Sequence, residues 1–175
     1  MDAYIKLYDK TTNAERQRRS LYSIVSCAGR TGNDETVLRY ADKALQAQIT
    51  NEQVVEVKYR KAKALLAKDD KAGARPLLED LSKDTRSVYG AESDYLFSQL
   101  LFDSGDADEA QKVIMSFIQD GTPHTYWLAR SFILLSDIYR SQGKDVEARQ
   151  YLLSLKSNYT GEDDDIAQMI ASRLE

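Results

Sequence analysis

The sequence is poor in the residues that build β turns, disulfides and metal sites. Its 175 residues include two prolines, eight glycines, one cysteine and one histidine. So few prolines and glycines leave little room for the turns of a β-rich fold. Cys27 cannot form a disulfide within the chain, and together with His124 it supplies too few ligands for a zinc site. No glycine-rich phosphate loop or nucleophile elbow occurs either. We therefore expect a protein that is not an enzyme, with no catalytic residue, no metal and no cofactor.

Long apolar runs and clustered positive charge are also missing. No stretch approaches the roughly 18 apolar residues that span a bilayer, so we expect no membrane insertion. The first 30 residues lack the charged-then-apolar order of a secretory signal. The formal net charge is -4, and the nearest basic cluster is Arg16, Arg18 and Arg19. Because phosphate binding needs a clustered basic face, we expect no nucleic-acid partner.

What the chain does contain is a repeat with a period of 36 to 38 residues. Four helix-breaking positions serve as its anchors: Gly32, Asp69, Gly105 and Gly143. Small or slim side chains recur seven residues before and five residues after each anchor, namely Val25, Ala62, Ser98 and Ser136, then Val37, Ala74, Ala110 and Ala148. Apolar residues recur nine and twelve residues after it: Ala41 and Ala44, Leu78 and Leu81, Ile114 and Phe117, Leu152 and Leu155. Each unit therefore reads as two amphipathic helices, and the whole as a solenoid of helical hairpins.

Apolar period and cap signals predict where the helices lie. We expect helices over about 15–30 and 34–48, 52–68 and 71–83, 86–104 and 107–119, and 124–142 and 145–158. Thr12 with Glu15 and Thr50 with Gln53 are capping-box pairs, and Asp106 with Glu109 is an acidic capping pair. Pro76 falls inside the 71–83 segment, so that helix is expected to start late or bend slightly. The corresponding hairpins cover about 15–49, 50–84, 85–121 and 122–159, in one domain.

Both ends of the chain carry further helical patterns. After a break at 160–161, apolar residues follow at helical spacing: Ile166, Met169, Ile170 and Leu174. They predict a capping helix within 160–175, with the acidic side chains of 162–165 at its N-terminus, where negative charge is favourable. A calcium site there is the weaker interpretation, because consecutive Asp side chains radiate around a helix. Residues 1–14 resemble the last helix of a preceding repeat, so we expect the C-terminal part of a longer array, with an apolar N-terminal edge that can self-associate.

The third and fourth units carry a resemblance to a known repeat. The residues that carry it are Ala91, Glu92, Asp94, Tyr95, Phe97, Ser98, Leu101, Gly105, Asp106, Asp108, Glu109 and Ala110, then Ala129, Phe132, Leu135, Ser136, Tyr139, Gly143, Glu147, Ala148 and Leu152. They look like the first helix, turn and second helix of a tetratricopeptide repeat. The first two units depart from that pattern at Val37, Asp69 and Pro76, and the period exceeds the family's usual 34 residues.

Four such degenerate repeats imply an all-α fold, a right-handed α-α hairpin superhelix that binds a protein or peptide without catalysis. The longer period is similar to that of bacterial cell-envelope members of the family. That similarity implies a periplasmic location, with the cytoplasm as the alternative.

In such arrays the first helices line the concave face. The positions 13, 10, 6 and 3 residues before each anchor form one stripe of a first helix. They hold Arg19, Tyr22, Ser26 and Gly29; Glu56, Tyr59, Lys63 and Leu66; Glu92, Tyr95, Gln99 and Phe102; Arg130, Ile133, Asp137 and Arg140. Of these, with Arg60 added, we take as the candidate binding face Arg19, Tyr22, Ser26, Tyr59, Arg60, Lys63, Tyr95, Gln99, Phe102, Arg130, Ile133, Asp137 and Arg140.

The recurrence of tyrosine in this stripe has two interpretations. Tyr22, Tyr59 and Tyr95 offer flat amphipathic surface that suits an extended peptide or a partner helix. Alternatively, they pack between neighbouring first helices and point their hydroxyls to water. Lysine and asparagine, which clamp a terminal carboxylate in chaperone-binding relatives, are replaced here by Tyr22 and Ser26, so no such clamp is expected. Trp127 is expected to pack the fourth first helix against the third unit.

Two functions fit this pattern. The first is a peptide-binding scaffold with an open concave face. The second is a structural or oligomerisation segment of a larger assembly, whose faces are covered by another copy or by further repeats.

Overall fold

A computed structural model describes residues 1–161 and 165–175, and this part of the chain is all-helical, without strands. It divides into two compact units, Met1–Leu81 and Ser82–Glu175. The first contains α1 (Asp2–Lys10), α2 (Ala14–Arg30), α3 (Asp34–Gln46), α4 (Asn51–Ala67) and α5 (Lys71–Leu81). The second contains α6 (Val88–Asp103), α7 (Ala107–Asp120), α8 (Thr125–Ser141), α9 (Asp145–Asn158) and α10 (Ile166–Leu174). The eight helices expected in the four hairpins are present, with bounds within about two residues of those expected.

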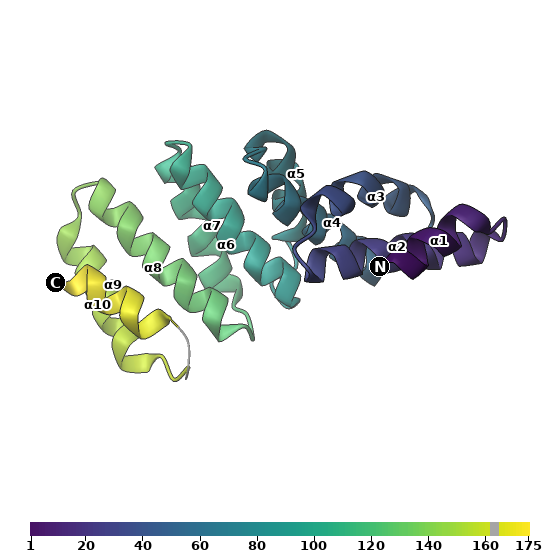
Figure 1. Ribbon diagram of the computed structural model, residues 1–175. Helices are drawn as coiled ribbons and strands as arrows, with labels where there is room; N and C mark the ends of the chain where they lie inside the picture. The colour runs from purple at the N-terminus through teal and green to yellow at the C-terminus, as the bar shows by residue number, and fades with distance from the viewer. Residues whose placement is uncertain (162–164) are drawn as a thin grey trace. The chain divides into compact units, whose positions relative to one another are not determined.

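Within each unit, successive helices fold back beside one another (Figure 1). In the first unit α1 to α5 pack in chain order, and the first helices α2 and α4 also contact each other. In the second unit α6 and α8 are in contact in the same way, and α10 packs against both α8 and α9. This arrangement is consistent with a helical repeat.

The four anchors adopt the left-handed conformation that ends a helix. Their φ angles are 68° at Gly32, 59° at Asp69, 86° at Gly105 and 74° at Gly143. The same backbone hydrogen bond closes the turn at each anchor. The amide of the residue after the anchor donates to the carbonyl of the residue four positions before the anchor. These bonds are Asn33 to Ala28 (2.9 Å), Asp70 to Leu65 (2.9 Å), Asp106 to Leu101 (3.0 Å) and Lys144 to Tyr139 (2.9 Å). The pattern is the Schellman motif, so the repeat read from the sequence is a repeat of backbone geometry.

The predicted close-packing positions are fully buried. All eight small side chains beside the anchors have no exposed surface: Val25, Val37, Ala62, Ala74, Ser98, Ala110, Ser136 and Ala148. Small side chains at these positions let the two helices of a hairpin approach closely. The core of each unit therefore lies where the periodicity places it.

The helix caps follow the sequence in part. Thr50 and Gln53 form the expected reciprocal capping box at α4. At α2 the prediction was wrong, because the cap is Asn13, whose side chain accepts the amide of Arg16 at 3.0 Å. Asp106 occupies the cap position of α7 but makes no side-chain capping bond. Of the two alternatives for α5, a late start does not occur, since the helix begins at Lys71 with Pro76 inside it, and a slight bend stays a prediction.

The two ends of the chain are helical as expected. α10 begins after Asp165, whereas most of the predicted acidic run, 162–164, lies outside the described residues. At the other end, Ile5 and Tyr8 of α1 pack against the core of the first unit. None of the described helices has the length and apolar character that crossing a membrane requires.

Candidate functional site

In the first unit, the candidate residues converge on a buried carboxylate, Glu56 of α4. Its side chain is 6% exposed. The hydroxyl of Tyr22 donates to Oε2 at 2.7 Å, and the hydroxyl of Ser26 donates to Oε1 at 2.9 Å. Arg60 donates to the same Oε1 from Nη2 at 3.3 Å. The Glu56 carboxylate thus accepts hydrogen bonds from α2 and from its own helix, α4, and so links the two helices.

The pKa of Glu56 records the balance of these contacts. Burial by itself would raise the pKa, but the hydrogen bonds from Tyr22 and Ser26 and the charge of Arg60 together outweigh it, so the pKa lies below its usual value. Glu56 is therefore ionised at neutral pH and forms a partly buried ion pair with Arg60.

Arg60 owes its position to a glycine on the neighbouring helix. A Cβ built on Gly29 of α2 would lie 2.3 Å from Cδ of Arg60. The Arg60 guanidinium carbon lies 5.4 Å from the ring centre of Tyr59, and Nζ of Lys63 lies 6.0 Å from it. Tyr59 is 6% exposed. Its ring is thus a buried platform, with two cations beside it.

In the second unit, Arg130 of α8 occupies the position that Glu56 occupies in the first. Its Nη2 donates to the hydroxyl of Tyr95 on α6 at 2.9 Å, and its guanidinium lies 4.9 Å from the centre of the Tyr95 ring. Nη1 donates to the hydroxyl of Tyr126 at 3.0 Å and pairs with Asp165 Oδ2 at 3.2 Å. One guanidinium therefore links α6, α8 and the start of α10.

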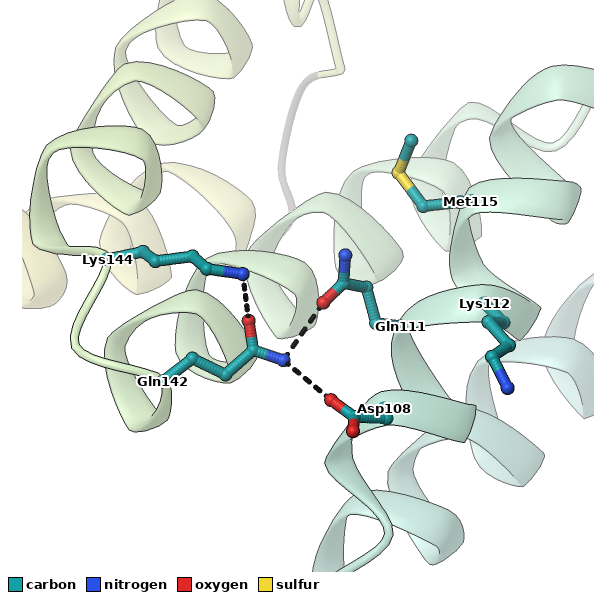
Figure 2. Close-up of a pocket in the computed structure, with 6 residues that line it drawn as sticks. All are labelled: Asp108, Gln111, Lys112, Met115, Gln142 and Lys144. Atoms are coloured by element: carbon teal, nitrogen blue, oxygen red, sulfur yellow. Dashed lines mark hydrogen bonds between the residues drawn. The ribbon is translucent and has the colours of Figure 1, made fainter.

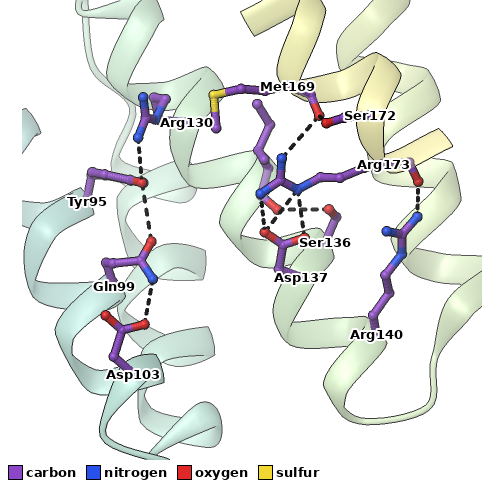
Figure 3. Close-up of polar contacts among 11 residues, drawn as sticks. Tyr95, Gln99, Asp103, Arg130, Ser136, Asp137, Arg140, Met169, Ser172 and Arg173 are labelled. Carbon is purple, nitrogen blue, oxygen red and sulfur yellow. Dashed lines mark hydrogen bonds and ion pairs between the residues drawn. The ribbon is translucent and has the colours of Figure 1, made fainter. Parts of the chain in front are cut away.

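The polar chain continues along α6 (Figure 3). The Tyr95 hydroxyl donates to Gln99 Oε1 at 3.3 Å, and Gln99 Nε2 donates to Asp103 Oδ1 at 2.8 Å. Tyr95 itself is 8% exposed, and its ring lies 5.7 Å from that of Trp127. The Trp127 ring packs against the preceding first helix, as expected.

The candidate residues of α8 all contact α10. At the N-terminal end Arg130 pairs with Asp165. In the middle Ile133, which is 1% exposed, lies in an apolar cluster with Ile166 and Ile170. At the other end Asp137 accepts from Arg173, and Arg140 donates to the backbone carbonyl of Arg173. The whole α8 stripe is thus a surface that holds an amphipathic helix (Figure 3).

The charges on the two helices specify a direction. Two residues of α8 form ion pairs with α10: the cation Arg130, near the start of α8, and the anion Asp137, one turn beyond its middle. α10 begins beside the anion Asp165 and ends near the cation Arg173. The two helices therefore run in the same direction, and a reversed α10 would bring like charges together.

Magnitudes separate the roles of these contacts. Burying an isoleucine side chain contributes about 1.5–3 kcal/mol, so the cluster around Ile133 supplies most of the free energy of docking. A partly exposed ion pair contributes about 0–1 kcal/mol. The ion pairs at the two ends therefore select direction and register more than they add stability.

The remaining candidate residues are placed differently. Arg19 is exposed and pairs with Glu15 on its own helix. Phe102 is half-buried and Lys63 is exposed. Ile133 is fully covered, so a ligand reaches it only when α10 moves away.

Sequence reasoning left out three residues that organise these contacts. Glu56 stands in the stripe but was not selected, while Asp165 and Arg173 were read only as part of a capping helix. The available signal is the spacing: Tyr22 and Glu56 are 34 residues apart, and Tyr95 and Arg130 are 35 apart. In both units the bonding partner stands three residues before the position that is one full repeat after the tyrosine.

A second polar surface lies between α7 and the turn that joins α8 to α9 (Figure 2). This hollow of about 670 Å³ contains Gln142, whose Nε2 donates to Asp108 at 3.3 Å and to Gln111 at 2.9 Å. Lys144 donates to Gln142 Oε1 at 2.8 Å. These side chains bond one another, which is the arrangement of a solvated helix surface.

Two comparisons of the sequence with known proteins found no match. No protein-family model matches the chain, and no curated protein matches its sequence. Among the residues that the structure describes, no three His, Cys, Asp or Glu side chains are grouped so that they could hold a metal ion.

Proposed function

We propose that this chain is a non-catalytic protein-interaction scaffold whose first helices bind an amphipathic helix of a partner protein. The observation that carries the proposal is the contact between α8 and α10. A nine-residue helix is held there by an apolar centre and by an ion pair at each end. Helix-in-groove recognition in other proteins uses the same elements, apolar anchors at helical spacing with flanking charges.

The geometry of α10 defines what a partner helix must offer. It presents an acidic residue at its start, apolar residues one, four and five positions later, and a basic residue eight positions later, which in α10 are Asp165, Ile166, Met169, Ile170 and Arg173. A helix with this pattern and this direction would satisfy Arg130, Ile133 and Asp137 together.

Because α10 occupies the surface, the partner helix and α10 would compete for it. The partner binds only those molecules in which α10 is undocked. Its apparent affinity is therefore its intrinsic affinity multiplied by the undocked fraction. Loosening α10 would therefore increase partner binding.

The test is affinity capture with three forms of the full chain. The parent is compared with an Ile170→Ser/Arg173→Ala variant, which loosens α10, and with the same variant carrying Asp137→Ala. Circular dichroism first checks that all three are folded. We expect a protein that the loosened form enriches over the parent and that Asp137→Ala releases. Equal capture by all three forms would contradict the use of this face. The matched control is the loosened variant carrying Asp108→Ala in place of Asp137→Ala. This substitution removes an exposed carboxyl that lies outside the stripe.

A second function is supported by the N-terminal helix. On α1, Tyr4 and Leu7 are 40% and 41% exposed, although Ile5 and Tyr8 of the same helix face the core. This exposed apolar edge favours a structural segment that associates with another copy or with further repeats. Sedimentation of the parent and of Leu7→Glu distinguishes the two functions: a dimer that Leu7→Glu dissociates supports the structural one.

We also propose the architecture and location that the tetratricopeptide resemblance implies, a right-handed superhelix in the periplasm, with the cytoplasm as the alternative location. The four equivalent Schellman turns support the architecture, as do the contacts of α2 with α4 and of α6 with α8, each within its own unit. Small-angle scattering tests the superhelix. Fractionation of cells that express the tagged chain tests the compartment.

A further inference from the structure

A buried carboxyl in the second unit lacks the contacts that buried charges normally have. Asp94 of α6 is 5% exposed, and among the described residues its Oδ1 has no hydrogen-bond partner. The side chain lines a hollow of about 350 Å³ that is bounded by α6, α7 and the segment before α6. Buried polar groups are normally paired, so an unpaired carboxyl oxygen beside a hollow calls for a partner.

The other repeats place a different chemistry at this register. Asp94 stands eleven residues before its anchor, and the equivalent residues are Leu21, Lys58 and Phe132. Leu21 and Phe132 line the corresponding hollows of the first and fourth repeats with hydrocarbon. Lys58 donates from Nζ to Asp80 at 2.6 Å. At this position the other three repeats carry an apolar side chain or an ammonium paired with a carboxylate. Among the four repeats, the third alone carries a carboxylic acid there.

The surroundings of Asp94 add negative charge. Asp120 of α7 lines the same hollow, and its Oδ2 accepts from the hydroxyl of Ser116 at 3.4 Å. Lys83 is the one cationic side chain in the lining. Burial first, and then the charge of Asp120, raise the pKa of Asp94 to about 8, so without a cation beside it the carboxyl holds its proton at neutral pH.

We propose that this hollow binds an alkylammonium group, as carried by a lysine side chain or a free polyamine, between the carboxyls of Asp94 and Asp120. The Lys58 to Asp80 contact shows that an ammonium and a carboxylate already pair in this part of the second repeat. Phe97, Val113 and Phe117 supply an apolar wall for the methylenes of such a ligand. On binding, Asp94 loses its proton to solvent and becomes the counter-ion of the ammonium. The site shares no residue with the contacts of α10, so it goes beyond the proposed helix-binding function and does not depend on it.

The test uses two amines and one neutral analogue with the full chain. The Asp94 carboxyl ¹³C shift is followed during titration with Nα-acetyl-lysine methylamide, with putrescine, and with Nα-acetyl-norleucine methylamide. We expect saturable binding of an amine with a Kd on the order of 1 mM, a pKa of Asp94 at least one unit lower in the bound state, and no response to the norleucine compound. Tighter binding of the lysine compound identifies a protein side chain as the ligand, and tighter binding of putrescine a polyamine.

Two variants keep the test decisive. Asp94→Leu introduces the residue found at the same register in the first repeat, so it is expected to fold and to lose amine binding at least tenfold. Asp108→Asn removes an exposed carboxyl elsewhere on the unit and is expected to bind as the parent does. Equal amine binding by Asp94→Leu and the parent, or no response at ten times the expected Kd, would overturn the proposal.

Discussion

Arg173 and Asp137 join the last helix of the chain to α8 through three hydrogen bonds. Nε of Arg173 lies 2.8 and 3.0 Å from the two carboxylate oxygens, and Nη2 lies 2.7 Å from one of them (Figure 3). Both side chains are a little over one quarter exposed, so the pair is partly shielded from solvent. Its position, near the end of both helices, makes it a latch for α10.

Breaking this latch is expected to weaken docking without unfolding the unit. Arg173→Ala removes a bidentate, partly shielded contact, so the free energy of docking α10 falls by about 1 kcal/mol. Hydrogen exchange of the α10 amides should accelerate about fivefold, while the amides of α8 change little. A double-mutant cycle with Asp137→Ala isolates the pair, and a coupling energy of zero would mean that the contact has no energetic role.

The second anchor offers a stabilising substitution. Asp69 adopts φ 59°, which costs free energy for a residue with a Cβ, whereas the equivalent anchors are glycines. Asp69→Gly should therefore raise the free energy of unfolding of the first unit by about 0.5–1 kcal/mol. Thermal melts by circular dichroism measure the change.

Gly32→Ala is the matched control for that substitution. Gly32 has φ 68° with nothing within 4 Å of the position of a Cβ, so any loss of stability comes from the backbone alone. We expect a loss of about 1 kcal/mol. If both substitutions change the free energy of unfolding in the same direction, the left-handed backbone conformation does not determine stability at these anchors.

Acid should weaken the first unit through Glu56. Its pKa is lowered in the folded state, so its ionised form stabilises the fold above the unfolded pKa of 4.5, and that contribution is lost as the pH falls through the lower folded pKa. Between about pH 5 and pH 3, the parent is expected to lose more stability than Glu56→Gln. Hydrogen exchange of α2 and α4 follows the change. The control is Glu35→Gln, at an exposed partner of Arg39. This variant should lose as much stability as the parent between about pH 5 and pH 3.

Asp94 predicts the opposite pH dependence in the second unit. Its folded pKa of about 8 exceeds the unfolded value of 3.8, so the protonated carboxyl is the form that the fold favours. The contribution of Asp94 to the free energy of unfolding is complete below pH 3.8 and is lost as the pH rises toward 8. The stability advantage of Asp94→Leu over the parent should thus grow from about pH 4 to pH 8. Fluorescence of Trp127, whose ring lies 5.7 Å from that of Tyr95 within this unit, reports the unfolding. A pH-independent difference would show that Asp94 ionises normally in the fold.

The repeat and its helices could be predicted because they depend on local chemistry. Anchors such as Gly105 need a left-handed backbone, and small residues such as Ala110 are needed where two helices touch, so both leave a periodic mark in the sequence. Caps were less predictable, because Thr12 and Asn13 are adjacent and either can accept an amide at a helix start.

The candidate site was predictable as a stripe but not as a set of contacts. Periodicity places Tyr22 and Tyr95 on one face of their helices, but it does not say that their hydroxyls meet Glu56 and Arg130 of the next first helix. Those pairings depend on how far one helix slides along its neighbour. The contact of α10 with α8 depends on the same unknown, so the capping helix was expected but its charged latch was not.

The most direct test of helix binding by α8 is a fluorescence anisotropy titration. A labelled peptide of residues 165–175 is added to the full chain carrying Ile170→Ser/Arg173→Ala. We predict saturable binding that Asp137→Ala weakens about fivefold, and that a peptide with its Asp165 and Arg173 charges exchanged does not reproduce. No saturable binding, or equal binding of the two peptides, would contradict a helix-binding face on α8.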